Sequence, residues 1–334
     1  MQAFTYTRAK SVDHAIETSA HASTAQQGAE IRFVAGGTTL IDLMKLDVEK
    51  PMQVIDINRL PLANIERDGD GGFRVGALVR NADLANHAQI RQAYPVLSQA
   101  LLAGASGQLR NMATTSGNLL QRTRCVYFRD INSACNKRSP GSGCAAMDGY
   151  HRNLAILGVS EHCIASNPSD MNVALMALDA TVSIRGPKGQ RDVAVADFFV
   201  LPGDAPQRET VMEPGELITH VRIPPAKAGA KSLYLKLRDR ASYEFALASV
   251  AIVMGLEGGR IRDVAIAMGG VGTRPWRSAA AEQALRGNAP GQAVFENAAK
   301  AFLADARPHP GNQFKLELAR RCLIKAMSDL SASA

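Results

Sequence analysis

The first sixty residues alternate between helical and strand-like spacing of their apolar positions. Ser11 precedes three apolar residues that share one face of a helix, and the apolar run at 31–35 predicts a buried strand. Two glycines and two threonines at 36–39 break that strand, a short helix follows, and 54–57 predicts a second strand. This order predicts a β-turn-α-β unit.

The middle of the chain, from about residue 62 to 222, combines strand signals with a long stretch that has little periodicity. Strands are predicted near 72–75, at 181–185 and at 190–195, and a Gly-Pro-Lys-Gly turn joins the last two. By contrast, 122–166 shows no sustained pattern, and long stretches of this kind in compact domains are usually functional. We therefore predict an α+β region that carries a functional insertion.

A linker signal separates the last third of the chain from the rest. Pro224-Pro225 begins a stretch of small and turn-forming residues that ends at Gly229. Beyond it, apolar runs predict a sheet followed by helices. The predicted strands are 233–237, 246–256 and 261–268, the last two joined at Gly258-Gly259, and the predicted helices lie around 278–286, 292–304 and 313–330.

Composition excludes several classes of protein. The chain has 334 residues, 46% hydrophobic and 21% charged, which is globular and neither disordered nor fibrous. Its longest uncharged apolar stretch, Phe245 to Leu256, has 12 residues, too few for a membrane span, and the N-terminus shows no apolar signal segment. The net charge of +7 favours an anionic partner, but dispersed cations and only 5% aromatic residues argue against nucleic acid.

Two polar segments have the composition of backbone loops that approach a polar ligand. Gly36-Gly37-Thr38-Thr39 lies between a predicted strand and a predicted helix, where backbone N–H groups and hydroxyls can donate to a phosphate. The segment 105–119 holds many small hydroxyl residues, glycines and amides between leucine pairs, which indicates a loop anchored on a core. Neither segment is a Gly-x-Gly-x-x-Gly or Walker A sequence, and either alone is also compatible with simple chain reversal.

Four of the five cysteines lie within 39 residues of the middle region. These are Cys125, Cys135, Cys144 and Cys163, whereas Cys322 lies on the apolar face of the last predicted helix, where we expect it in the core. The spacings lack the Cys-x2-Cys pairs of structural zinc sites. Wide, irregular spacing suits a 4Fe-4S cluster, in which each iron takes one thiolate.

Two alternatives to the cluster remain open: a zinc site that uses His151 or His162, and four unrelated buried thiols. The cations around the cysteines favour the cluster, because they would offset thiolate charge and could also meet an acidic partner. They are Arg122, Arg124, Arg129, Lys137, Arg138 and Arg152.

Five motifs occur in an order that resembles one family. They are Val34-Ala35-Gly36-Gly37-Thr38, Gln108-Leu109-Arg110-Asn111, Thr114-Thr115-Ser116-Gly117-Asn118, Pro168-Ser169-Asp170 and Met268-Gly269-Gly270-Val271. Across nearly the whole chain, this order resembles the FAD-binding subunit of the xanthine dehydrogenase and aldehyde oxidase family. With the cysteine segment, the chain is most similar to the FAD and 4Fe-4S subunit of bacterial periplasmic aldehyde oxidoreductases. The flavoprotein of 4-hydroxybenzoyl-CoA reductase also carries an inserted cluster, so a subunit of that kind, or of another molybdenum hydroxylase, is the alternative.

The resemblance implies an α+β fold in two domains. Residues 1–222 would form a two-part FAD-binding domain of the vanillyl-alcohol-oxidase/PCMH type, with subdomains at about 1–60 and 62–222. Residues 122–166 would be the cysteine-rich insertion into it. Residues 226–334 would form a smaller sheet-plus-helices domain of the CO-dehydrogenase-flavoprotein type.

The resemblance also implies the residues that hold FAD without a covalent bond. The first loop and the Thr114–Asn118 motif would cradle the diphosphate and ribityl chain, Ser169 and Asp170 would hold the adenosine side, and Lys236 would approach the flavin. Gln121 departs from the small hydroxyl residue of many relatives, and 50 residues separate Asn118 from Ser169, where many relatives have almost none. The full set is Phe33, Val34, Ala35, Gly36, Gly37, Thr38, Thr39, Leu40, Ala105, Thr114, Ser116, Gly117, Asn118, Ser169, Asp170, Leu217 and Lys236.

No catalytic constellation of side chains stands out, which fits a subunit whose cofactor performs the chemistry. By resemblance, a large partner subunit oxidises an aldehyde at a molybdenum cofactor, a small 2Fe-2S subunit relays the electrons, and FAD in this chain passes them to an external acceptor. We expect the heterotrimer to fold and load in the cytoplasm and to reach the periplasm through a twin-arginine signal on a partner.

Overall fold

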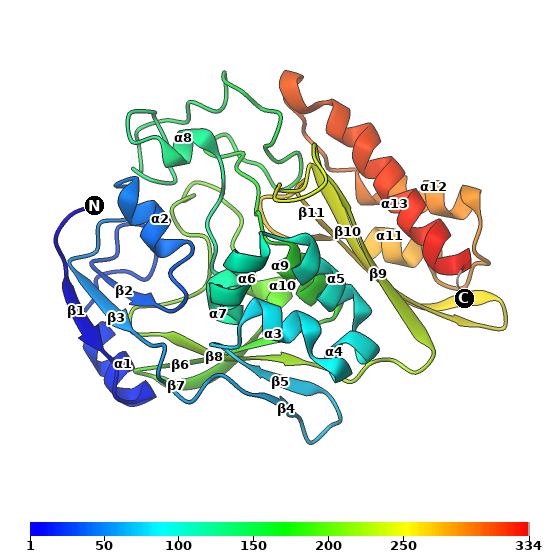
Figure 1. Cartoon of the computed structure of the whole chain (residues 1–334). Coiled ribbons are helices and arrows are strands. Elements are labelled where there is room, and N and C mark those ends of the chain that lie inside the picture. Colours follow the sequence, from blue (N-terminus) through cyan, green and yellow to red (C-terminus); the bar gives the residue numbers. More distant parts are fainter. Residues whose placement is uncertain (333–334) are drawn as a thin grey trace.

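The computed structural model describes residues 1–332, which contain three β-sheets and the helices packed on them (Figure 1). The first sheet is parallel, with the order β1-β3-β2, and lies at the blue end of the chain in Figure 1. The hydroxyl of Ser11 accepts a hydrogen bond from the backbone N–H of His14, so it caps the first helix as predicted. The elements here are β1 (Thr5–Arg8), α1 (Val12–Ser19), β2 (Ile31–Val34), α2 (Leu40–Lys45) and β3 (Gln53–Asp56).

The second sheet is antiparallel and has the order β4-β5-β8-β6-β7. Its apolar side chains belong to the largest core cluster, together with those of α5 (Pro95–Ala103) and α9 (Asp170–Ala177). The predicted hairpin that joins 181–185 to 190–195 is present. The strands are β4 (Ile65–Arg67), β5 (Phe73–Gly76), β6 (Thr181–Gly186), β7 (Gly189–Ala194) and β8 (Leu217–Ile223).

The third sheet is antiparallel, has the order β12-β11-β10-β9, and carries helices on both faces. Val250 and Ile252 pack in one core with the C-terminal helices, while Ala251, between them, joins the core of α5 and α9. A strand buried on both faces explains the long apolar run of the sequence. The elements are β9 (Ala230–Leu237), β10 (Ala248–Glu257), β11 (Arg260–Gly269), β12 (Trp276–Arg277), α11 (Ala279–Leu285), α12 (Gln292–Phe302), the 3-10 helix η1 (Pro310–Asn312) and α13 (Phe314–Ala332).

The predicted insertion 122–166 holds a single short helix and otherwise irregular backbone, near the top of Figure 1. The prediction of a loop at 105–119 is wrong in detail, because two short helices form there. The hydroxyls of Ser106 and Thr114 accept hydrogen bonds from the backbone N–H groups of Leu109 and Gly117, which caps both helices. The short helices are α3 (Asn81–Asn86), α4 (Ala88–Ala93), α6 (Gly107–Met112), α7 (Thr115–Leu119), α8 (Val126–Arg129) and α10 (Val195–Phe198).

The α+β fold class is confirmed, with the glycine turn, the sheet of the last third and its helices near the predicted positions. The sequence did not reveal β1, β4, β8, β12 or any of the helices α3 to α10. Cys322 is buried in α13 as expected. Within residues 1–332, no helix has the length and apolar character needed to cross a membrane.

Candidate functional site

A large pocket opens beside the glycine turn of the first sheet. Its walls are the turn itself, α7, the first residues of the insertion and the segment that leads into β8. The cavity between them has a volume of about 240 Å³. The predicted cofactor residues on these walls are Phe33, Ala35, Gly36, Gly37, Thr38, Thr39, Leu40, Thr114, Ser116, Gly117 and Leu217.

The glycine turn forms a backbone cradle at this pocket. A Cβ atom at Gly36 would collide with the backbone carbonyl of Met112, so only glycine fits there. Gly37 has a φ of +73°, a conformation that residues with a side chain rarely adopt. The hydroxyl of Thr39 does not cap the helix that follows. The turn can therefore bring backbone N–H groups and a hydroxyl to a bound phosphate.

The second predicted loop offers mainly its backbone to the pocket, because its hydroxyl side chains make hydrogen bonds within the protein. The hydroxyl of Thr114 accepts from the N–H of Gly117 at 3.2 Å, and that of Ser116 donates to the carbonyl of Ala77 at 3.0 Å. Both side chains are buried. They hold α7 in place at the pocket wall.

Other predicted residues lie away from the large pocket. Ser169 and Asp170 line a smaller neighbouring pocket beneath the 239–249 segment. Lys236 donates to Asp170 at 2.8 Å from β9, in a buried ion pair. Val34, Ala105 and Asn118 line neither pocket, although the Asn118 side-chain oxygen accepts from the Ser169 hydroxyl at 2.8 Å. Most of the predicted set therefore lines one of two adjacent cavities, whereas Val34, Ala105, Asn118 and Lys236 line neither, and the role of each residue toward FAD stays a prediction.

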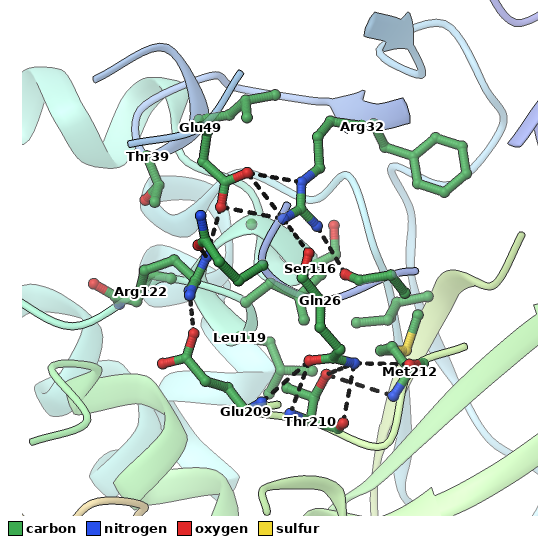
Figure 2. A pocket seen from close by; sticks show the side chains of 18 of the residues that line it. Gln26, Arg32, Thr39, Glu49, Ser116, Leu119, Arg122, Glu209, Thr210 and Met212 are labelled. Atoms are coloured by element: carbon green, nitrogen blue, oxygen red, sulfur yellow. Dashed lines mark hydrogen bonds and ion pairs between the residues drawn. The ribbon is translucent and has the colours of Figure 1, made fainter. Parts of the chain in front are cut away.

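A chain of charged side chains crosses the large pocket (Figure 2). Arg32 contacts Glu49 at 2.9 Å, Glu49 contacts Arg122 at 2.6 Å, and Arg122 also pairs with Glu209. Burial raises the pKa of Glu209, but the charges of Arg122 and Lys137 and their hydrogen bonds outweigh it, so the pKa lies below its ordinary value. No motif signals this group, because its members are far apart in the sequence.

Arg122 leaves one donor unused. Its Nη2 atom is buried and has no hydrogen-bond partner within residues 1–332. A buried, unpaired guanidinium nitrogen is costly unless it meets an acceptor. Because Arg122 lines the large pocket, an anionic ligand there could accept from it.

The four clustered cysteines line one small cavity behind the large pocket. Cys135 and Cys144 face each other across a short antiparallel bridge, and none of the four forms a disulfide. Burial raises the pKa of Cys125 to about 12, and it also raises the pKa values of Cys144 and Cys163. These thiols therefore need a positive partner to ionise.

Within residues 1–332, no three His, Cys, Asp or Glu side chains lie close enough together to hold a single metal ion. The cysteines instead surround a shared cavity, each from a different part of the insertion.

The whole chain matches known families and relatives. The model described as the FAD binding domain in molybdopterin dehydrogenase matches residues 2–226, and that of the CO dehydrogenase flavoprotein C-terminal domain matches residues 233–330. The aldehyde oxidoreductase FAD-binding subunit PaoB of Escherichia coli is 51% identical, with 100% of both chains covered. The glyceraldehyde dehydrogenase medium chain of Sulfolobus acidocaldarius is 27% identical, with 98% of each covered.

Solved structures share the fold. The carbon monoxide dehydrogenase of Hydrogenophaga pseudoflava matches with a TM-score of 0.76 and 26% identity, over 99% of this chain and 98% of that one. Reconstituted CO dehydrogenase from Oligotropha carboxidovorans matches with a TM-score of 0.77 at 23% identity, over 100% and 99%.

Fold and pocket together define an FAD-binding protein of the oxidoreductase class. More specifically, the chain belongs to the FAD-binding medium-subunit family of the molybdenum-dependent dehydrogenases and aldehyde oxidoreductases. The pocket fits this cofactor, since it combines a glycine cradle with an unpaired buried arginine nitrogen.

Proposed function

We propose that this chain binds FAD and a 4Fe-4S cluster and carries electrons within a three-subunit aldehyde oxidoreductase. A large molybdenum subunit would oxidise the aldehyde, a small 2Fe-2S subunit would relay the electrons, and this chain would deliver them to an external acceptor. The names of the relatives support this, since they describe an aldehyde oxidoreductase FAD-binding subunit and dehydrogenase medium chains.

The side chains of this protein hold and shield the cofactor. FAD, when bound, supplies the electron exchange. The glycine turn and Arg122 would bind its diphosphate, and the apolar Phe33 and Leu217 on the pocket wall would exclude water. No side chain is assigned a proton-transfer role.

One observation supports the cluster above all others: four buried or partly buried cysteines converge on one cavity beside the FAD pocket. Thiolates are the usual ligands of iron-sulfur clusters, which take one per iron and so need ligands spread around a volume. Lys137 lies on the wall of the cavity. Its charge would offset part of the negative charge of thiolates.

The cluster is tested by iron and sulfide analysis and by visible spectra. We expect about four irons per chain. Serine at Cys125, Cys135, Cys144 or Cys163 should remove or distort the cluster. The matched control is Cys322→Ser, in a cysteine buried in α13, which should keep full iron content. Stoichiometric zinc in place of iron would refute the assignment.

The subunit role is tested by comparing the chain alone with the chain co-expressed with its two partners. Alone, it should bind FAD and show no aldehyde turnover with a dye acceptor, because the proposal places aldehyde oxidation on the molybdenum subunit. With the partners it should co-purify and turn over. Aldehyde oxidation by the isolated chain would contradict the proposal.

Location forms a separate part of the proposal. The complex would load its cofactors in the cytoplasm and reach the periplasm through a partner's twin-arginine signal. Cell fractionation after co-expression of all three subunits measures this. Recovery of the complex from the cytosol alone would rule out export and leave the electron-transfer role intact.

A further inference from the structure

Lys137 lies on the wall that separates the cysteine cavity from the FAD pocket. Three residues of the insertion line both cavities: Lys137, Cys163 and Ala165. The wall is therefore a single layer of side chains at this place. A charge within it acts on both cavities.

The position of the Lys137 ammonium is fixed. Its Nζ atom donates to the backbone carbonyl of Pro206 at 2.9 Å and to the Glu209 carboxylate at 3.0 Å. The side chain is only 8% exposed. With two fixed acceptors and little access to solvent, the charge stays in the wall and is weakly screened.

The charges around Lys137 do not cancel. Arg32, Arg122 and Lys137 contribute three positive charges, and Glu49 and Glu209 contribute two negative ones. One positive charge therefore remains on this connected group. His162, which also lines the cysteine cavity, pairs with the exposed Asp204 at 3.4 Å.

We propose that Lys137 is a positioning residue for electron transfer, which places a positive charge between the two redox groups and raises the reduction potential of both. Glu209 anchors this charge and partly offsets it. An added electron on either side is stabilised by the ammonium, as second-shell charges generally tune metal and flavin sites. The inference depends on the proposed function, since it requires FAD and an iron-sulfur group in these cavities.

The experiment measures reduction potentials in the full chain, purified with both groups loaded. FAD and iron contents are determined first, and these report on the proposed function itself. Spectroelectrochemical titration then gives the potentials. Lys137→Gln should lower both reduction potentials. Lys137→Arg, which keeps the positive charge, should leave both potentials at their wild-type values. Glu209→Gln, which removes the offsetting negative charge, should raise them.

Potential shifts of opposite sign in Lys137→Gln and Glu209→Gln indicate an electrostatic role. A structural role would instead show as lower cofactor content in both variants, because both would damage the wall. Lys325→Gln is the matched control, since it removes the same charge from the exposed face of α13 and should change nothing. If Lys137→Gln does not load, Lys137→Arg and Glu209→Gln decide the outcome. Unchanged potentials in loaded Glu209→Gln, or equal shifts in Lys325→Gln, would overturn the inference.

Discussion

Gly36 lies in a turn whose backbone leaves no room for a side chain. The backbone of the turn passes so close to the carbonyl of Met112 that a methyl group has no place between them. The contact brings the turn after β2 against the end of α6, and the turn borders the large pocket. A side chain here would push the two segments apart.

Gly36→Ala should therefore lower the FAD content of the purified chain severalfold and cost about 1–3 kcal/mol of stability, a typical penalty for overpacking. The ratio of flavin absorbance to protein measures the first effect, and the urea midpoint measures the second. Gly107→Ala is the control, because a Cβ atom at Gly107 meets nothing within 4 Å. Full flavin content in Gly36→Ala would show that the turn does not cradle the cofactor.

At this scale the sequence revealed only part of the site. The glycine turn could be predicted because its signal is local, with two glycines and two threonines between a strand and a helix. Glu49 and Glu209 could not, since each is an ordinary glutamate until folding brings both to Arg122. Ion pairs between distant segments leave no local pattern.

Helix α13 carries an unusual buried cation. Lys315 is fully buried and donates to the carbonyls of Leu154 and Gly270, at 2.9 and 2.7 Å. Burial lowers its pKa from 10.5 to about 7, and the charge of Arg152 adds to the effect. Through this one amine, α13 is bonded to the insertion at Leu154 and to Gly270, the residue after β11.

This pKa predicts a pH-dependent stability. Between about pH 7 and 10.5 the unfolded chain holds a proton on Lys315 that the folded chain has released, so stability rises with pH. The slope approaches about 1.4 kcal/mol per pH unit in the middle of this window. Urea midpoints at pH 7.5 and 9 should rise more in the wild type than in Lys315→Met. Identical slopes in both proteins would contradict the lowered pKa.

Among the elements, the long strands and helices of the last third followed their apolar periodicity, whereas none of the helices α3 to α10 was predicted. The last helix, predicted at 313–330, forms at Phe314–Ala332. By contrast, α6 and α7 have six and five residues, and their stability comes from side-chain caps and packing. A window long enough to reveal periodicity is longer than either helix.

In the whole molecule, the two family-matched regions are joined by more than the linker. Residues 224–229 are exposed and have no helix or strand. Asp170 of α9 accepts hydrogen bonds from Tyr234 and Lys236 of β9, at 2.5 and 2.8 Å, and α5 also packs on β9. The contacts therefore continue across the linker through a buried ion pair, which is costly to break.

Brief trypsin treatment should cut first after Lys227, in the exposed linker, and the two fragments should stay together on a sizing column. They should separate only in denaturant. Lys227→Gln should delay the cut without changing the elution of the intact chain. Fragments that part under native conditions would mean that the β9 contacts are too weak to hold the halves.

The overall arrangement was only partly predictable. The linker and the final sheet follow from local signals, whereas the position of β8 between β5 and β6 depends on pairing between distant segments. Such pairing is set by which apolar faces find a common core. The resemblance to a known family supplied what periodicity could not.

The wall shared by Lys137, Cys163 and Ala165 also bears on how such a chain changes over generations. The insertion is not a detachable module, because it closes one side of the cofactor pocket. A lineage that deleted it would open that side to water, and would have to acquire new side chains there before flavin could be retained. Gain and loss of the segment are therefore unequal evolutionary steps.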